Sequence, residues 1–159
     1  MNRAARRSKH KPAKLPAISS PVHRAMAKAE STAAIANFHS TCTGVSIRIL
    51  MAQDGEDCAE LLGDIAYIVG TGCQAGAAHV GREPWVRTLH GTLRQIIDLC
   101  LSGYQWRTDY AMGLQRSIEI VTEHLPGMPA QAWYEGMLDA RMLARAIEDR
   151  NIDGNEVAQ

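Results

Sequence analysis

The 159-residue chain has a formal net charge of zero, but the two signs are separated along it. The first 28 residues carry eight of the 17 basic side chains and no carboxylate, whereas the rest carries nine arginines and all 17 carboxylates. The length predicts one domain with its own core. No apolar run approaches the ~20 residues that a membrane-spanning helix needs. The four scattered cysteines exclude a small secreted scaffold held together by disulfides.

Residues 1–19 form a basic, proline-containing arm with few large apolar side chains. Such a segment buries too little apolar surface to offset the entropy of ordering, so we expect it to be disordered when unbound. Its clustered cations are typical of a segment that contacts nucleic acid or an acidic protein. The candidate nucleic-acid-binding residues are Arg3, Arg6, Arg7, Lys9, Lys11 and Lys14.

The first helix is expected over residues 20–53, with Ser20 as its cap and Pro21 in its first turn. An apolar stripe recurs along it at intervals of three and four residues: Ile35, Phe38, Cys42, Val45 and Ile49. The opposite face is polar but almost uncharged, which is unusual for a solvated surface, so we expect a second contact there, such as self-association. This face includes His39, Ser40, Thr43 and Ser46.

A turn led by Asp54 is expected to cap a second helix over residues 56–80. Within that helix Gly72 and Gly76, four residues apart, are predicted helix-packing positions that allow a neighbouring helix to approach closely. Residues 70–76 also resemble a glycine-rich phosphate-binding loop. The segment after them has a helical period instead of forming a strand that ends in an acidic residue, so close helix packing is the favoured interpretation.

Three further helices are expected over residues 84–101, 108–125 and 129–148, each with an apolar stripe of helical period. No segment alternates with period two, so no sheet is predicted. The predicted fold class is therefore all-α, an antiparallel bundle of about five helices over residues 20–150, followed by a disordered tail over residues 151–159. Three aromatic residues near predicted helix starts are expected to be core or interface anchors: Trp85, Trp106 and Trp133.

Two potential metal ligands, His39 and Cys42, lie three residues apart on the first helix, and His79, His90 or Cys73 could complete a site. Cys42 also belongs to the apolar stripe, where a free thiol behaves as a small hydrophobic group. We therefore expect no metal and no cofactor. A small metal-binding or catalytic helical protein stays an alternative.

Two carboxylates one turn apart on the fourth helix, Glu119 and Glu123, are followed by His124. They could act as an acid–base pair, but an exposed helix face often carries such neighbours. No cysteine is next to a histidine, so no activated thiol is indicated, and we expect no enzymatic activity. A helix-turn-helix needs a small residue four positions before its turn glycine and an apolar residue six positions after it. Around Gly103 those positions hold Leu99 and Asp109, so the motif is absent there.

The chain opens with MNRAARR, and these residues resemble the start of uncharacterised small helical proteins of proteobacterial phages and prophages. That resemblance implies a bacterial mobile-element origin and no catalytic function. The sequence as a whole predicts a cytoplasmic, non-enzymatic helical interaction or adaptor protein whose basic arm contacts nucleic acid or an acidic partner. A DNA-binding regulator with a helical dimerisation core is the second alternative.

Overall fold

The computed structural model of the chain describes residues 21–79 and 84–150. These residues form α1 (Pro21–Met51), α2 (Ala59–His79), α3 (Pro84–Leu101), α4 (Ala111–His124) and α5 (Ala130–Glu148), with 3₁₀ turns at Thr108–Tyr110 and Leu125–Gly127. Within the described ranges the only β-type pairing is an isolated bridge between Asp57 and Gln105. The predicted all-α bundle is confirmed, and each predicted helix lies within a few residues of its observed bounds.

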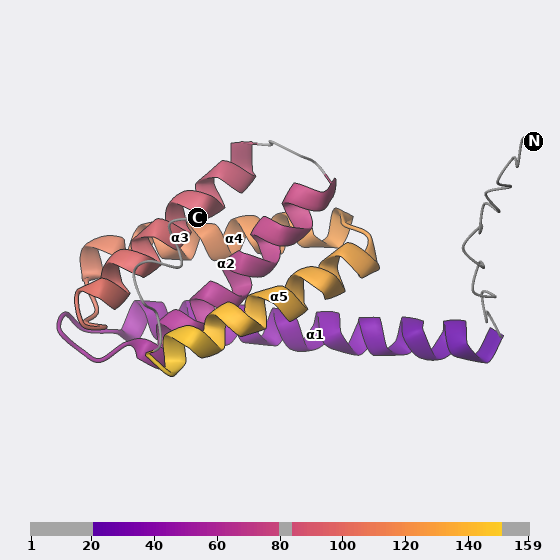
Figure 1. Ribbon diagram of the computed structural model, residues 1–159, viewed down its shortest axis with the longest axis horizontal. Helices are drawn as coiled ribbons and strands as arrows, with labels where there is room; N and C mark the ends of the chain where they lie inside the picture. The colour runs from indigo at the N-terminus through magenta and orange to yellow at the C-terminus, as the bar shows by residue number, and fades with distance from the viewer. Residues whose placement is uncertain (1–20, 80–83, 151–159) are drawn as a thin grey trace, which may run out of the picture.

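The central helix is α2, which contacts all four other helices (Figure 1). Its middle is apolar on nearly every side, and Leu62, Ile65, Ile68 and Val69 are fully buried. A helix that is hydrophobic all round belongs in a core, because no face of it is suited to water. Each such side chain contributes roughly 1.5–3 kcal/mol through removal of its apolar surface from water.

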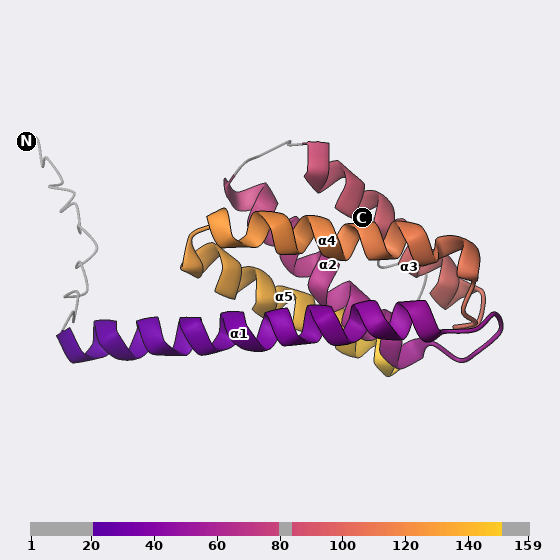
Figure 2. The ribbon, with the colours of Figure 1, turned by 180° about the vertical axis from the view of Figure 1, so that it is seen from behind.

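The longest of these helices is α1, whose 31 residues span about 46 Å at the usual helical rise. Its C-terminal half packs on the bundle through the predicted apolar stripe, in which Phe38 and Ile49 are almost completely buried. The Phe38 ring lies 5.1 Å, centroid to centroid, from the ring of Trp133 on α5. The N-terminal part of α1 projects beyond the other helices (Figures 1 and 2).

The two predicted helix-packing glycines both face neighbouring helices closely. A β-carbon built on Gly72 would lie 2.6 Å from Val121 Cγ2 on α4 and 2.7 Å from Leu89 Cδ1 on α3. A β-carbon on Gly76 would lie 2.5 Å from the Trp85 ring on α3. All three distances are shorter than real β-carbon contacts, so a larger residue at either position would displace a neighbour.

Residues 70–76 lie inside α2, so the alternative of a phosphate-binding loop is wrong. In an α-helix these N–H groups already bond to carbonyls one turn earlier, and they are not available to a phosphate. The helix is also continuous through these glycines, since α2 runs without a break to His79.

The packing of α2 against α5 was not expected from the sequence. A β-carbon on Gly70 would lie 3.1 Å from the β-carbon of Ala140, and one on Gly136 would lie 3.1 Å from the carbonyl oxygen of Thr71. The two helices therefore meet almost backbone to backbone. The available signal was the spacing of small residues on α5, where Gly136, Ala140 and Ala144 follow one another at four-residue intervals and are all buried.

The loops after α1 and α3 pair with each other at one end of the bundle. The Gly55 N–H donates to the Trp106 carbonyl at 3.0 Å, and the Trp106 N–H donates to the Glu56 carbonyl at 2.8 Å. The Cys58 N–H donates to the Tyr104 carbonyl, also at 2.8 Å. These bonds tie the start of α2 to the connection between α3 and α4.

This pairing changes which aspartate caps α2. The prediction that Asp54 caps the second helix is wrong, because its Oδ1 instead accepts a hydrogen bond from the Thr108 N–H at 2.6 Å. The cap is supplied by Asp57, whose Oδ1 accepts from the Ala59 N–H at 3.1 Å. Asp54 therefore fastens one loop to the other.

Candidate functional site

The predicted nucleic-acid-binding residues lie outside the described residues, as do the whole predicted arm, 1–19, and the predicted tail, 151–159. These binding residues are Arg3, Arg6, Arg7, Lys9, Lys11 and Lys14. The structure does show where the arm joins the bundle. It precedes Pro21, at the projecting end of α1 (Figure 2).

The opposite end of α1 is acidic. Residues 54–64, which include the loop after α1 and the first turns of α2, contain five carboxylates and no basic residue. Two arginines from outside this acidic segment pair with it: Arg48 with Asp64, and Arg150 with Asp57. The members of the acidic segment are Asp54, Glu56, Asp57, Glu60 and Asp64. The chain therefore has a basic segment before α1 and an acidic segment after it.

A groove of about 430 Å³ lies between α1 and α4. On the α1 side, the groove is lined by the candidate metal ligands and by part of the polar face. On the α4 side, it is lined by the carboxylates Glu119 and Glu123. Its lining residues are His39, Cys42, Thr43, Ser46, Ile118, Glu119, Thr122 and Glu123. Beside this α1–α4 groove the Gln115 side-chain amide donates to the Ser46 hydroxyl at 3.2 Å and so links the two helices.

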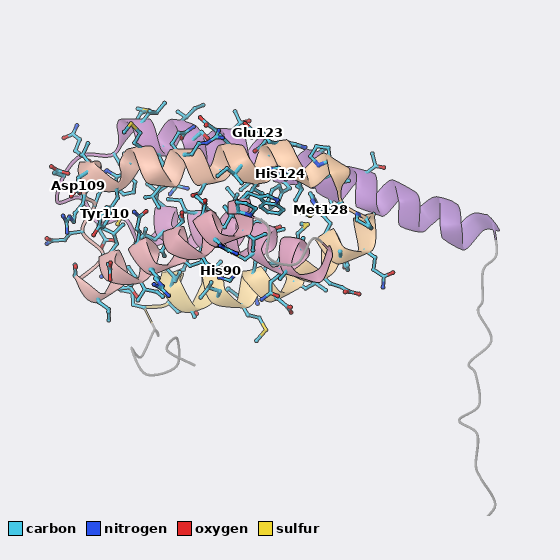
Figure 3. The ribbon with its side chains drawn as sticks, turned by 90° about the horizontal axis from the view of Figure 1, so that it is seen from above. His90, Asp109, Tyr110, Glu123, His124 and Met128 are labelled. Carbon is cyan, nitrogen blue, oxygen red and sulfur yellow. The ribbon has the colours of Figure 1, made fainter. Side chains whose placement is uncertain are left out.

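A single guanidinium holds both carboxylates of the α1–α4 groove. Arg116 Nη1 lies 3.0 Å from Glu119 Oε2 and 3.3 Å from Glu123 Oε1. The two carboxylates and Arg116 therefore form an ion-pair cluster on an exposed helix face, which is an ordinary arrangement for neighbours one turn apart. His124 lies outside the groove, on the α3 side of α4, where it stacks on Trp85 with the ring centroids 4.5 Å apart (Figure 3).

The four thiols are buried and free. For Cys42, this burial follows from its place on the apolar stripe of α1. Burial raises the pKa of Cys42 to about 11, against a smaller opposing effect of the Thr122 hydroxyl. Burial likewise raises the pKa of Cys58 to about 11 and that of Cys73 to about 12, and it raises the pKa of Cys100. A cysteine nucleophile acts as the thiolate, so at neutral pH these groups are packing residues.

The described part of the chain contains no group of three or more His, Cys, Asp or Glu side chains that could hold a metal ion. His39 and Cys42 do share the α1–α4 groove. Of the residues expected to complete a site, His90 is exposed on α3 (Figure 3) and Cys73 is buried in α2. The side chain of His79 lies outside the described residues.

Trp106, which the sequence predicts to be a core or interface anchor, is also a candidate binding residue. Its side chain is 1% exposed, and its Nε1–H is buried without a hydrogen-bond partner among the described atoms. The ring also lines a hollow of about 280 Å³ between the end of α1 and the start of α2. Buried indole N–H groups normally find an acceptor, and no sequence pattern signals an exception of this kind.

None of the helices in the described ranges is long and apolar enough to cross a membrane. No protein-family model, no curated protein and no solved structure matches the chain. Its function is therefore inferred from its own charge distribution and surfaces.

Proposed function

We propose that the protein is a non-enzymatic helical interaction protein that binds nucleic acid through its basic arm. The observation that carries this proposal is the separation of charge along α1, with the arm before the helix and the acidic segment after it. A polyanion is attracted to the arm end and repelled by the acidic end. Within one copy, binding through the arm would therefore hold the acidic end of the bundle away from the nucleic acid.

The length of α1 disfavours capture of the arm by the acidic segment of the same chain. A flexible chain of 19 residues, as the arm's composition predicts, has a root-mean-square end-to-end distance of about 24 Å. The helix separates the start of α1 from the acidic segment by about 46 Å. Reaching back would stretch the arm to nearly twice its mean end-to-end distance and would cost part of its conformational freedom. The arm is therefore more available to another molecule.

The expected binding mode is electrostatic and independent of sequence. Lysines and arginines that meet phosphates release condensed counterions, and the affinity then falls as salt rises. If six or more arm cations meet phosphates of duplex DNA, affinity should fall by about a thousandfold or more between roughly 50 and 200 mM salt.

The test compares binding to random-sequence DNA and RNA across that salt range. Arg3→Ala, Arg6→Ala and Arg7→Ala together should flatten the logarithmic salt slope by up to about 3 units. A matched control removes three exposed arginines of the bundle, Arg87, Arg94 and Arg145. We expect this control to bind with the slope of the unmodified protein.

Two results would reject the proposal. Equal, negligible binding by the full chain and by a chain lacking residues 1–19 would leave an acidic protein as the arm's partner. An equal loss in the bundle control would place the binding surface on the bundle. A marked preference for one DNA sequence would favour the alternative of a DNA-binding regulator.

A further inference from the structure

A second stripe runs along α1 on the side opposite its buried stripe, and one of its members, Thr43, lies at the edge of the α1–α4 groove. Its residues repeat at alternating intervals of three and four, the heptad spacing of helices that pair side by side. All six are exposed, and we call them the outer seam: Ala33, Ala36, Ser40, Thr43, Ile47 and Leu50. Ile47 is 53% exposed and Leu50 is 76% exposed, so the seam includes large apolar groups that nothing in the described chain covers.

The outer seam carries no charge. Arg48 is the one formally charged residue from Thr32 to Met51, and it pairs with Asp64 on α2. The buried stripe, which includes Phe38 and Ile49, occupies the opposite side of the helix. A helix face in contact only with water normally carries charged residues, whereas a face that packs on a second helix excludes them. The composition of the seam therefore matches another uncharged helix face and not a polyanion.

We propose that the outer seam packs against the outer seam of a second copy, as an antiparallel α1–α1 pair that makes the protein a homodimer. The seam is self-complementary, since both copies present the same uncharged stripe. The antiparallel direction follows from charge. It brings the basic segment before α1 of one copy near the acidic segment of the other, whereas a parallel pair would set two basic arms side by side.

Full overlap of two antiparallel helices of this length fixes the centre of the pair. The middle residue of Pro21–Met51 is Ala36, so Ala36 would lie opposite its own copy on the twofold axis. The small side chains of Ala33, Ala36 and Ser40 then lie near the centre, where they permit a close approach. The larger Ile47 and Leu50 fall opposite the first turns of the second helix.

The size of the contact is compatible with a weak but specific dimer. A strip about 46 Å long and about 10 Å wide covers roughly 460 Å² on each copy, or about 900 Å² in total. A contact of this size lies at the low end of protein interfaces, below about 1,200 Å², where weak and transient pairs are found, so we expect concentration-dependent association. The pair would also support the part of α1 that projects beyond the bundle (Figure 2), because a short helical segment without tertiary contacts is only marginally stable in water. The dimer does not require the arm to bind nucleic acid, but in the antiparallel pair the arm of one copy lies near the acidic segment of the other, which would weaken its attraction to a polyanion.

The first test measures the mass of the full chain in solution over about 1 to 200 μM by sedimentation or light scattering. The unmodified protein should pass from monomer to dimer. Ala36→Glu should weaken the dimer by at least about tenfold, because two carboxylates then face each other at the centre of the pair. Glutamate is a good helix former, so the helical circular dichroism should be unchanged. The control is Met142→Glu, at a position on α5 that is 76% exposed, and it should dimerise normally.

The second test establishes the direction of the pair by oxidation of single introduced cysteines. Ala36→Cys should cross-link to its own copy. Ile47→Cys should not, because the two copies of that position lie about 33 Å apart along an antiparallel pair. The native thiols are buried and will not compete. A monomer at about 200 μM, equal behaviour of the two glutamate variants, or cross-linking through Ile47→Cys instead of Ala36→Cys would each overturn the proposal.

Discussion

The helices α2 and α1 differ in how much of their surface the rest of the bundle covers. Four neighbours surround α2, and its apolar residues occupy nearly all sides. The bundle covers only one face of α1, and the outer seam on the opposite face is exposed. Continuous apolar composition thus identifies the central helix, whereas a periodic stripe identifies a helix at the surface.

The same residue type contributes differently to the free energy of unfolding on the two helices. Leu62 on α2 is fully buried, whereas Leu50 on α1 is 76% exposed. Gly72 on α2 is in close contact with two neighbouring helices, whereas a β-carbon on Gly44 of α1 would meet nothing within 4 Å. These two matched pairs allow the comparison to be tested.

The largest expected effect is on the leucine pair. Leu62→Ala should lower the free energy of unfolding by about 2–5 kcal/mol, because it removes buried contacts and leaves a cavity. Leu50→Ala should change it by less than about 0.5 kcal/mol when the protein is monomeric. Urea denaturation at low protein concentration measures both. Equal losses would mean that the end of α1 is covered in solution even in the monomer.

The next largest expected effect is the change in stability when a glycine is replaced by alanine, which should differ in sign between Gly72 and Gly44. Gly72→Ala should destabilise the bundle by about 1–3 kcal/mol, since the new methyl group would overlap Val121 and Leu89. Gly44→Ala should stabilise it by about 0.4–1 kcal/mol, because alanine is the better helix former and the site has room. Thermal melts should therefore move in opposite directions. A shift of the same sign in both variants would contradict the close packing around α2.

Most of the fold could be predicted because helix periodicity is a local property of the sequence. The stripe from Phe38 to Ile49 and the stops near Gly103 and Pro126 required no knowledge of distant residues. The arrangement of the helices did require it. Gly70 meets Ala140, which is 70 residues away. The spacing of small residues marks a close-packing face on α5, but it does not indicate which helix packs there. Asp54 was misassigned as a cap for the same reason, since its partner Thr108 lies on a distant loop.

The candidate site was predictable only in pieces. His39 and Cys42 were noted on one helix, and Glu119 and Glu123 on another, but their meeting in the α1–α4 groove depends on how α1 packs against α4. The pairing of Arg116 with both carboxylates depends on the side-chain conformations, which the sequence does not specify. The basic arm was evident from charge alone, and the structure adds the length of α1 that separates it from the acidic segment.

The smallest expected effect concerns the junction between α1 and α2. The Thr108 N–H lowers the pKa of the Asp54 carboxyl, and the Ala59 N–H, together with Arg150, lowers the pKa of the Asp57 carboxyl. A carboxyl whose pKa is lower in the folded state stabilises the fold above its unfolded pKa, and that contribution is lost as the pH falls through the folded pKa. The loss should therefore begin below about pH 4.

Asp54→Asn together with Asp57→Asn should test this junction, because asparagine keeps an acceptor oxygen but cannot titrate. Melting temperatures would be compared at about pH 6 and about pH 3. The unmodified protein should lose more stability on acidification than the double variant, by a small margin because both carboxyls are exposed to solvent. Parallel pH profiles would show that the loop pairing, and not its two charged hydrogen bonds, holds α1 and α2 together at this end.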